Sequence, residues 1–237
     1  MRVIEIFDSL QGEGYWTGVP MTFVRLAGCN APGLGLECVR WCDTPASWDE
    51  EAGEDMQVGE ILDLVRLPRL CITGGEPLVQ PEGVAALVAE AHARGIRVHL
   101  ETNGTADPFV PGEAAGEGPE EVLEFDWVVV SPKAPGYLIS PGWDDRIDEL
   151  KLVVDDQLDV AIAERLAADC PGAFVSIQPE FEARRDGSGG QLKNGASPAE
   201  RGWCLAGSAS VARAIALVLT HPDWRLSLQT HKLLGIH

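Results

Sequence analysis

"LCITGGEPLVQPEGVAALVAEAHARGIRVHLETNGT", residues 70–105, is the stretch that decides the fold class. It opens with an apolar run at 70–72, turns at 73–77 through Gly and Pro, and ends with a second apolar run at 96–100. Between the two runs, residues 81–95 carry apolar side chains at helical spacing, namely Val84, Leu87, Val88 and Ala91. A strand, a helix and a second strand in this order predict a βαβ unit with parallel strands.

The same alternation extends along the rest of the chain. Further apolar runs predict strands at 22–26, 127–130, 150–154, 174–178 and 225–228. Helical spacing of apolar residues recurs at 158–170 and 209–221. Strands that are apolar on both faces are typical of a parallel sheet covered by helices, so the sequence predicts an α/β fold.

Two stretches interrupt this alternation. Residues 108–121 are rich in Pro, Gly and Glu, and residues 184–200 are rich in Gly and Ser. Such compositions are typical of mobile loops. Because the strand and helix pattern resumes after each, we expect one domain over residues 1–237 with two loop insertions.

Composition narrows the class of protein. Eighteen basic and 37 acidic residues give a net charge of −19, which argues against nucleic-acid partners that bind through neutralised phosphates. No run of 18 apolar residues is present, so we expect no membrane span. The N-terminal residues turn polar at once and lack the features of a signal peptide. We therefore expect a cytoplasmic protein whose cysteines stay reduced.

Polar, Gly-rich or Pro-rich turns follow five of the predicted strands. They begin or lie at Cys29, 73–77, 101–105, 131–133 and 178–180. In a parallel α/β sheet the carboxyl ends of the strands share one edge, where binding sites form. The five turns therefore predict one site along that edge.

Three of the six cysteines cluster at one of these turns. Cys29, Cys38 and Cys42 are separated by eight and then three residues. A structural zinc site takes four ligands, and an iron–sulfur cluster usually takes four cysteines. Three thiols leave one position of a metal centre open. The remaining three cysteines, Cys71, Cys170 and Cys204, are interpreted as core or surface thiols.

Several motifs together resemble a known family. They are SLQGEGYWTGVPMTFVRLAGCN (9–30), WCDT (41–44), TGGEP (73–77), LETNGT (100–105), SPK (131–133) and LQTHKLLGIH (228–237). The cysteines and the GGEP turn resemble the radical S-adenosylmethionine (SAM) enzymes. The full set resembles their 7-carboxy-7-deazaguanine synthase family, from Glu5 to His237 outside the two insertions. The spacing departs from the superfamily pattern, C-x3-C-x2-C, in both gaps.

The resemblance implies a fold and an activity. The fold is a partial (β/α)6-type radical SAM barrel with parallel strands and loop insertions. The activity is conversion of 6-carboxy-5,6,7,8-tetrahydropterin to 7-carboxy-7-deazaguanine with loss of ammonia, a lyase reaction of queuosine biosynthesis. The family's cofactors are a [4Fe–4S] cluster, SAM and Mg²⁺. An electron donor such as a flavodoxin or ferredoxin and a homodimeric state are expected with them.

Roles carry over residue by residue. The cluster ligands would be Cys29, Cys38 and Cys42, and the Mg²⁺ ligand Thr44. SAM would contact Trp41, Asp43, Gly75, Ser131, Pro132, Lys133, Gln178, Pro179 and Glu180. The substrate would contact Leu10, Gln11, Gly12, Glu13, Arg25, Thr73 and His237, the last through its α-carboxylate, with His231 near the site.

Plainer interpretations stay open for several of these residues. Thr44 is also a candidate helix N-cap, Gly75 a tight-turn glycine, Trp41 a core residue and Arg25 an ion-pair partner at a strand end. Two other functions stay open as well. One is a radical SAM activase that acts on a partner protein, and the other is a non-catalytic zinc-binding module.

Overall fold

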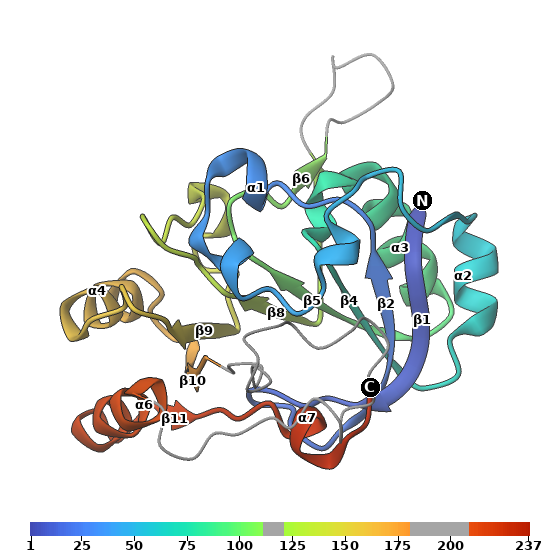
Figure 1. The fold of residues 1–237 in the computed structure, drawn as a ribbon. Helices are drawn as coiled ribbons and strands as arrows, with labels where there is room; N and C mark the ends of the chain where they lie inside the picture. The colour runs from blue at the N-terminus through green and yellow to red at the C-terminus, as the bar shows by residue number, and fades with distance from the viewer. Residues whose placement is uncertain (111–120, 181–208) are drawn as a thin grey trace, which may run out of the picture.

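The computed structural model describes residues 1–110, 121–180 and 209–237 (Figure 1). The larger sheet in these ranges has nine strands in the order β11-β10-β9-β8-β5-β4-β2-β1-β3. They are β1 (Arg2–Leu10), β2 (Pro20–Leu26), β3 (Glu54–Asp55), β4 (Arg69–Gly74), β5 (Arg97–Thr102), β8 (Trp127–Val130), β9 (Glu149–Val154), β10 (Phe174–Pro179) and β11 (Arg225–Leu226). Every strand predicted from the sequence is present.

The sheet is parallel from β2 to β11, as predicted. Two strands at one edge were not predicted from the sequence: β1 pairs with β2 in the antiparallel sense, and β3 pairs with β1 in the same sense. A turn that reverses the chain between Leu10 and Pro20 allows this pairing, since adjacent antiparallel strands need no helical crossover.

Helices connect several of the parallel strands. The longer ones are α2 (Val58–Leu64), α3 (Pro81–Ala93), α4 (Val160–Asp169) and α6 (Ala209–Thr220). In α3 the buried residues are Val84, Leu87, Val88 and Ala91, which are the four predicted from their spacing. In Figure 1, α2 and α3 lie toward one end of the sheet, and α4 and α6 toward the other.

Short helical turns occur in several of the remaining connections. They are α1 (Ala31–Leu34), η1 (Glu37–Arg40), η2 (Pro45–Ser47), η3 (Pro77–Val79), η4 (Pro141–Trp143) and α7 (Thr230–Leu234). Three of them, α1, η1 and η2, follow β2 in direct succession and shape the cysteine-bearing segment.

Two apolar clusters hold the helices to the sheet. One joins α3 to the middle strands and includes Leu87, Ile72 and Leu100. The other joins α4 and α6 to β9 and β10 and includes Leu166 and Leu217. Burial of a leucine side chain stabilises a fold by roughly 1.5–3 kcal/mol. These contacts fix the strands whose carboxyl ends carry the predicted turns.

The first predicted insertion is structured at its ends, because β6 (Phe109–Val110) pairs with β7 (Glu121–Val122) as a two-stranded antiparallel ladder. The second insertion, 184–200, and Cys204 lie outside the described residues. Among the helices of the described ranges, none has the length and apolar character needed to cross a bilayer.

Candidate active site

A cavity of about 260 Å³ lies along the edge of the sheet where the parallel strands end. Its walls bring together nearly all the residues predicted from the sequence. These are Leu10, Gln11, Gly12, Glu13, Arg25, Cys29, Cys38, Trp41, Cys42, Asp43, Thr44, Thr73, Gly75, Ser131, Lys133, Gln178, His231 and His237. Pro132, Pro179 and Glu180 do not line it, although each neighbours or closely follows a residue that does.

The three clustered cysteines reach the cavity through tight helical turns. Cys29 follows β2, and α1 takes up part of the long gap before Cys38. The unusual second gap is taken up by η1, which holds Cys38 and ends where the Trp41 N–H donates to the Cys38 carbonyl at 3.1 Å. All three thiols are free. The local winding therefore accommodates both departures in spacing while keeping the sulfurs at one cavity.

The chemistry of these thiols favours soft metals. Burial is the main reason that the pKa of Cys29 rises to about 11. Burial also raises the pKa of Cys38, although the nearby Lys133 ammonium opposes the rise. The thiols of Cys29 and Cys38 are therefore protonated near neutral pH until a metal displaces their protons.

The three thiols do not converge on a single point. Within the described ranges, no three His, Cys, Asp or Glu side chains are gathered closely enough to hold one metal ion. The cysteines nevertheless line one cavity and influence one another electrostatically. Such a donor set fits a group of several metal atoms better than a single ion, because the group itself spans the distance between the sulfurs.

Trp41 also fits a bound ligand. Its indole Nε1 is buried and has no hydrogen-bond partner among the described residues. A buried donor without an acceptor is costly, so an acceptor on a ligand would satisfy it. The same ring lies 5.5 Å from the Lys133 ammonium, measured from the ring centroid to Nζ.

Lys133 is buried near a second ammonium, that of Lys151. Burial is the first cause, and the charge of Lys151 the second, that lowers the pKa of Lys133 to about 8. Its Nζ donates to Ser131 Oγ at 2.5 Å. The predicted SPK turn thus places a cation and a hydroxyl at the same wall of the cavity.

Asp43 and Thr44 follow Cys42, the third of the clustered cysteines. Thr44 occupies the N-cap position of η2, yet its side chain forms no capping hydrogen bond. Its Oγ1 lies 3.7 Å from Cys42 Sγ. Asp43 Oδ2 pairs with Lys232 Nζ at 2.6 Å. Burial would raise the pKa of Asp43, but the Lys232 charge holds it below its usual value.

Gly75 is required for packing. A Cβ at this position would lie 2.7 Å from Cys29 Cβ and 2.8 Å from the Ser47 carbonyl oxygen, and closer still to the Gly28 carbonyl. Those distances are shorter than real Cβ atoms show, so the backbone of the GGEP turn can lie directly against the cysteine loop only because residue 75 has no side chain. Gly75 serves as the tight-turn glycine and also lines the cavity.

The turn after β1 carries the predicted substrate residues. Gln11 Nε2 donates to Glu101 Oε1 at 3.0 Å, and Thr73 Oγ1 donates to Glu101 Oε2 at 3.0 Å. Glu101 belongs to the LETNGT motif, but sequence reasoning gave it no role. It joins two predicted substrate residues in one polar network that faces the cavity.

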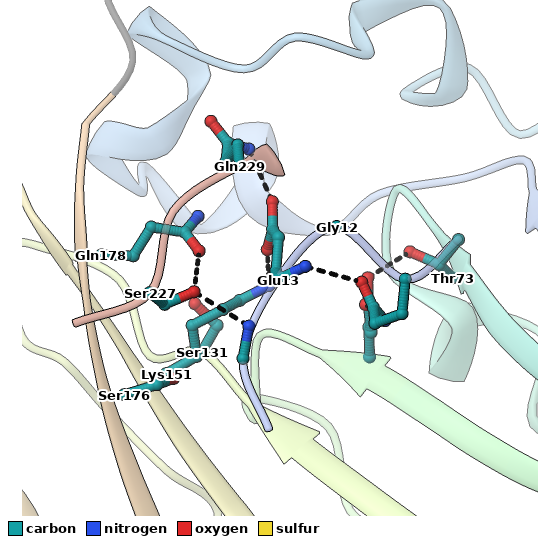
Figure 2. Close-up of polar contacts among 12 residues, drawn as sticks. Gly12, Glu13, Thr73, Ser131, Lys151, Ser176, Gln178, Ser227 and Gln229 are labelled. Atoms are coloured by element: carbon teal, nitrogen blue, oxygen red, sulfur yellow. Dashed lines mark hydrogen bonds and ion pairs between the residues drawn. The ribbon is translucent and has the colours of Figure 1, made fainter. Parts of the chain in front are cut away.

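Glu13 is held from both sides (Figure 2). Lys151 Nζ pairs with Glu13 Oε2 at 2.5 Å, and Gln229 Nε2 donates to Glu13 Oε1 at 2.6 Å. Burial would raise the pKa of Glu13, but the Lys151 charge and these hydrogen bonds hold it well below the usual range. Conversely, burial would lower the pKa of Lys151, but Glu13 and Glu101 raise it. Both groups are therefore charged at neutral pH.

Buried groups behind the turn fix its path. Glu149 accepts from Ser176 Oγ at 2.6 Å and from the Tyr15 N–H at 3.0 Å. Ser227 Oγ accepts from the Gly14 N–H and donates to Gln178 Oε1 at 3.0 Å, and Figure 2 shows this link. The turn is thus tied to strands from the other half of the sheet.

The C-terminal QTHK segment packs directly on this turn. Thr230 donates to the Gly12 carbonyl through its N–H at 2.9 Å and its hydroxyl at 3.0 Å. The His231 ring fills the space that a Cβ on Gly12 would take, so any side chain at position 12 would displace that ring. Burial lowers the pKa of His231, opposed by the Glu13 charge.

Arg25 has the structural role that the plainer interpretation assigned, and it also lines the cavity. Its Nε donates to Glu5 Oε1 at 2.8 Å, and its guanidinium carbon lies 5.8 Å from the Phe7 ring centroid. Phe7 in turn packs on the His237 ring at 4.6 Å between centroids. His237 therefore lies at the same wall as Arg25.

Sequence reasoning missed Lys151 and Gln229, which hold Glu13. Gln229 belongs to the LQTHK motif, but the sequence did not indicate that it forms a hydrogen bond with Glu13. For Lys151 a usable signal existed in ELKLVV, because a charged residue inside an apolar strand has to face a polar interior. Glu149 and Lys151 alternate on β9 and so share one face.

A mostly parallel, open α/β sheet with three free thiols at the carboxyl ends of its strands is the arrangement of the radical SAM fold class. The crystal structure of QueE from Escherichia coli superposes with a TM-score of 0.65 over 96% of this chain and 92% of that chain. The identity is 24%, so this likeness concerns the fold. No protein-family model matches the sequence.

Curated relatives give the family. The chain is 32% identical to 7-carboxy-7-deazaguanine synthase of Synechocystis sp., over 99% of this chain and 92% of the relative. It is 35% identical to the enzyme of the same name from Bacteroides thetaiotaomicron, over 99% and 98% of the two chains. The chain belongs to the 7-carboxy-7-deazaguanine synthase family.

Proposed function

We propose that this protein converts 6-carboxy-5,6,7,8-tetrahydropterin to 7-carboxy-7-deazaguanine with loss of ammonia, as a radical SAM lyase of queuosine biosynthesis. One observation carries the proposal. The thiol loop, the QGEG turn and the QTHK segment, which are far apart in sequence, line one cavity. An activase or a zinc module has no use for the charged, hydrogen-bonded Glu13 turn beside the thiols.

We propose that Cys29, Cys38 and Cys42 hold a [4Fe–4S] cluster and leave one iron for SAM. When bound, the cluster and SAM supply an electron and a hydrogen-abstracting carbon radical. Around them, the Trp41 indole N–H can donate to a bound acceptor and the Lys133 ammonium can pair with a carboxylate. The remaining predicted SAM contacts are Asp43, Gly75, Ser131, Pro132, Gln178, Pro179 and Glu180.

The substrate contacts follow from charge. Glu13 is ionised and partly committed to Lys151, and it presents a carboxylate that can accept from the guanidine-like nitrogens of a pterin. Arg25 lines the same cavity with a guanidinium suited to the substrate carboxylate. Leu10, Gln11, Gly12, Thr73 and His237 complete the proposed substrate set.

We propose Thr44 as the protein ligand of a Mg²⁺ ion. The side chain is not used as a helix cap, and its hydroxyl lies beside Cys42 in the cavity wall. When bound, Mg²⁺ supplies positive charge that orients a substrate carboxylate. Few protein oxygens are needed, because Mg²⁺ usually keeps several waters.

We further propose that residues 1–237 form one radical SAM domain, that the protein is a cytoplasmic homodimer, and that a flavodoxin or ferredoxin reduces the cluster. The domain proposal is supported by a single sheet whose strands run from Arg2 to Leu226. The reductant and the homodimer are inferred from the family.

Anaerobic reconstitution followed by assay tests the function. The protein is loaded with iron and sulfide and mixed with SAM, Mg²⁺, reductant and the tetrahydropterin. We expect a brown protein, formation of 5′-deoxyadenosine, and release of 7-carboxy-7-deazaguanine and ammonia. A cluster-loaded protein that cleaves SAM but leaves the pterin unchanged would contradict the proposal.

A further inference from the structure

We propose that Lys232 is a positioning residue that links the loop bearing Cys42 and Thr44 to the turn bearing Glu13. The link is a continuous series of contacts, Asp43–Lys232–Gln229–Glu13, whose two ends come from different walls of the cavity. The two ligands that these walls would hold, SAM with Mg²⁺ and the pterin, rest on the proposed function; the link itself does not.

Each contact in the series is close. Lys232 Nζ lies 2.6 Å from Asp43 Oδ2 and donates to Gln229 Oε1 at 2.8 Å. Gln229 Nε2 donates to Glu13 Oε1 at 2.6 Å (Figure 2). The Lys232 ammonium therefore contacts Asp43, which lies between Cys42 and Thr44. The Gln229 amide connects this ammonium to Glu13 in the turn after β1.

The Gln229 amide has only one favourable orientation. Its oxygen faces the Lys232 ammonium and its nitrogen faces the Glu13 carboxylate. A flipped amide would direct N–H groups at the cation and the oxygen at the anion, which is unfavourable at both ends. Removal of the ammonium releases this constraint, so we expect the amide and Glu13 to lose their fixed geometry.

Burial makes the link stronger than a surface ion pair. The Lys232 side chain is only 10% exposed, whereas the Asp43 side chain is 42% exposed. An ion pair that is fully exposed contributes little, but a largely buried ammonium that donates to two acceptors is held in place. Such a group can set the relative position of two loops.

Hydrogen–deuterium exchange of the full-length, cluster-loaded protein tests the link. Lys232→Met should speed exchange in both segments, 10–16 and 41–47, because the ammonium pairs with Asp43 and also donates to Gln229, whose amide holds Glu13. Gln229→Ala should speed exchange in 10–16 and leave 41–47 nearly as in the parent, because the pair between Lys232 and Asp43 remains. Arg165→Met, which removes an exposed ion pair to Asp169 outside this cavity, should change neither.

Kinetics provide the second readout. Lys232→Met should raise the KM for the pterin roughly tenfold with a smaller change in kcat, and Lys232→Arg should restore most of the loss. Faster exchange confined to 41–47, or a pterin KM equal to that of the parent, would overturn the proposed link. If the parent makes no product from the pterin, the proposed function is wrong, and the exchange pattern alone decides the link.

Discussion

At the scale of single residues, Arg25 has two roles in the structure that a substitution can distinguish. It pairs with Glu5 through Nε and also lines the cavity. If it binds the substrate carboxylate, Arg25→Lys should raise the pterin KM about tenfold, because lysine keeps the charge but loses the planar fork. Steady-state kinetics with varied pterin measure this change.

Glu5→Gln is the matched control for Arg25. It weakens the ion pair at 2.8 Å and leaves the guanidinium beside the cavity. We expect Glu5→Gln to keep the pterin KM within about twofold of the parent, since partly exposed ion pairs contribute little. Equal losses in the two variants would return Arg25 to a purely structural role.

Thr44 gives a prediction about magnesium. Its hydroxyl makes no capping hydrogen bond, so its removal should cost little stability. Product formation by metal-stripped, cluster-loaded enzyme should rise on addition of Mg²⁺, and Thr44→Ala should blunt the rise while Thr44→Ser keeps it. SAM cleavage should persist in Thr44→Ala. Full product formation in the presence of a chelator would remove the magnesium role.

At the scale of elements, the helical turns α1 and η1 determine whether Cys29, Cys38 and Cys42 can bind one metal cluster despite their unusual spacing. Cys38 lies inside η1. Cys38→Ala should abolish iron loading and SAM cleavage, measured by iron content and by 5′-deoxyadenosine, and Cys29→Ala and Cys42→Ala should do the same. The matched control is Cys170→Ala, at the end of α4 and remote from the cavity. A fully loaded Cys38→Ala protein would show that η1 carries no ligand.

The elements also show how far sequence reasoning extends. The parallel strands were predicted because they are apolar on both faces, and β9 is buried at all six positions. The strand β1 was missed because most of its residues are only partly buried and charges interrupt its apolar pattern. Its antiparallel pairing with β2 depends on the turn between Leu10 and Pro20, and the apolar periodicity of a strand does not indicate which strand it pairs with.

For the site, motifs at strand ends were predictable and the network between them was not. Turns such as GGEP can be predicted because Gly and Pro follow an apolar run. Glu13, Lys151 and Gln229 come from three distant parts of the chain, and only the folded sheet brings them together. Which of these residues contact one another is decided by the sheet topology. The sequence can therefore indicate which residues belong to the site, but not which of them form hydrogen bonds or ion pairs with each other.

At the scale of the whole molecule, His99 links stability to pH. It is 4% exposed and packs against Trp16. Burial, and then the charge of Arg69, lowers the pKa of His99 to about 4. Between pH 6.5 and pH 4, His99 is mostly protonated in the unfolded chain and mostly neutral in the folded protein. The free energy of unfolding therefore falls as the pH falls through this window.

His99→Phe tests this linkage, because it keeps a ring against Trp16 and removes the titration. Between pH 7.5 and pH 5, His99 should account for about 2 kcal/mol of lost unfolding free energy in the parent. Urea denaturation at the two pH values should therefore show a smaller loss in His99→Phe. Carboxylates contribute equally to both proteins, so identical losses would show that His99 is not responsible.

The contact between Glu13 and Gln229 joins residues 216 positions apart. On the ribosome, a nascent chain therefore presents its thiols and its QGEG turn long before the residues that complete the turn have been made. The hydrogen bond from Gln229 to Glu13 can form only after residue 229 has been made, so this support of the turn is added late in synthesis. A chain that stalls before residue 229 would retain every proposed cluster ligand and still lack the amide that holds Glu13.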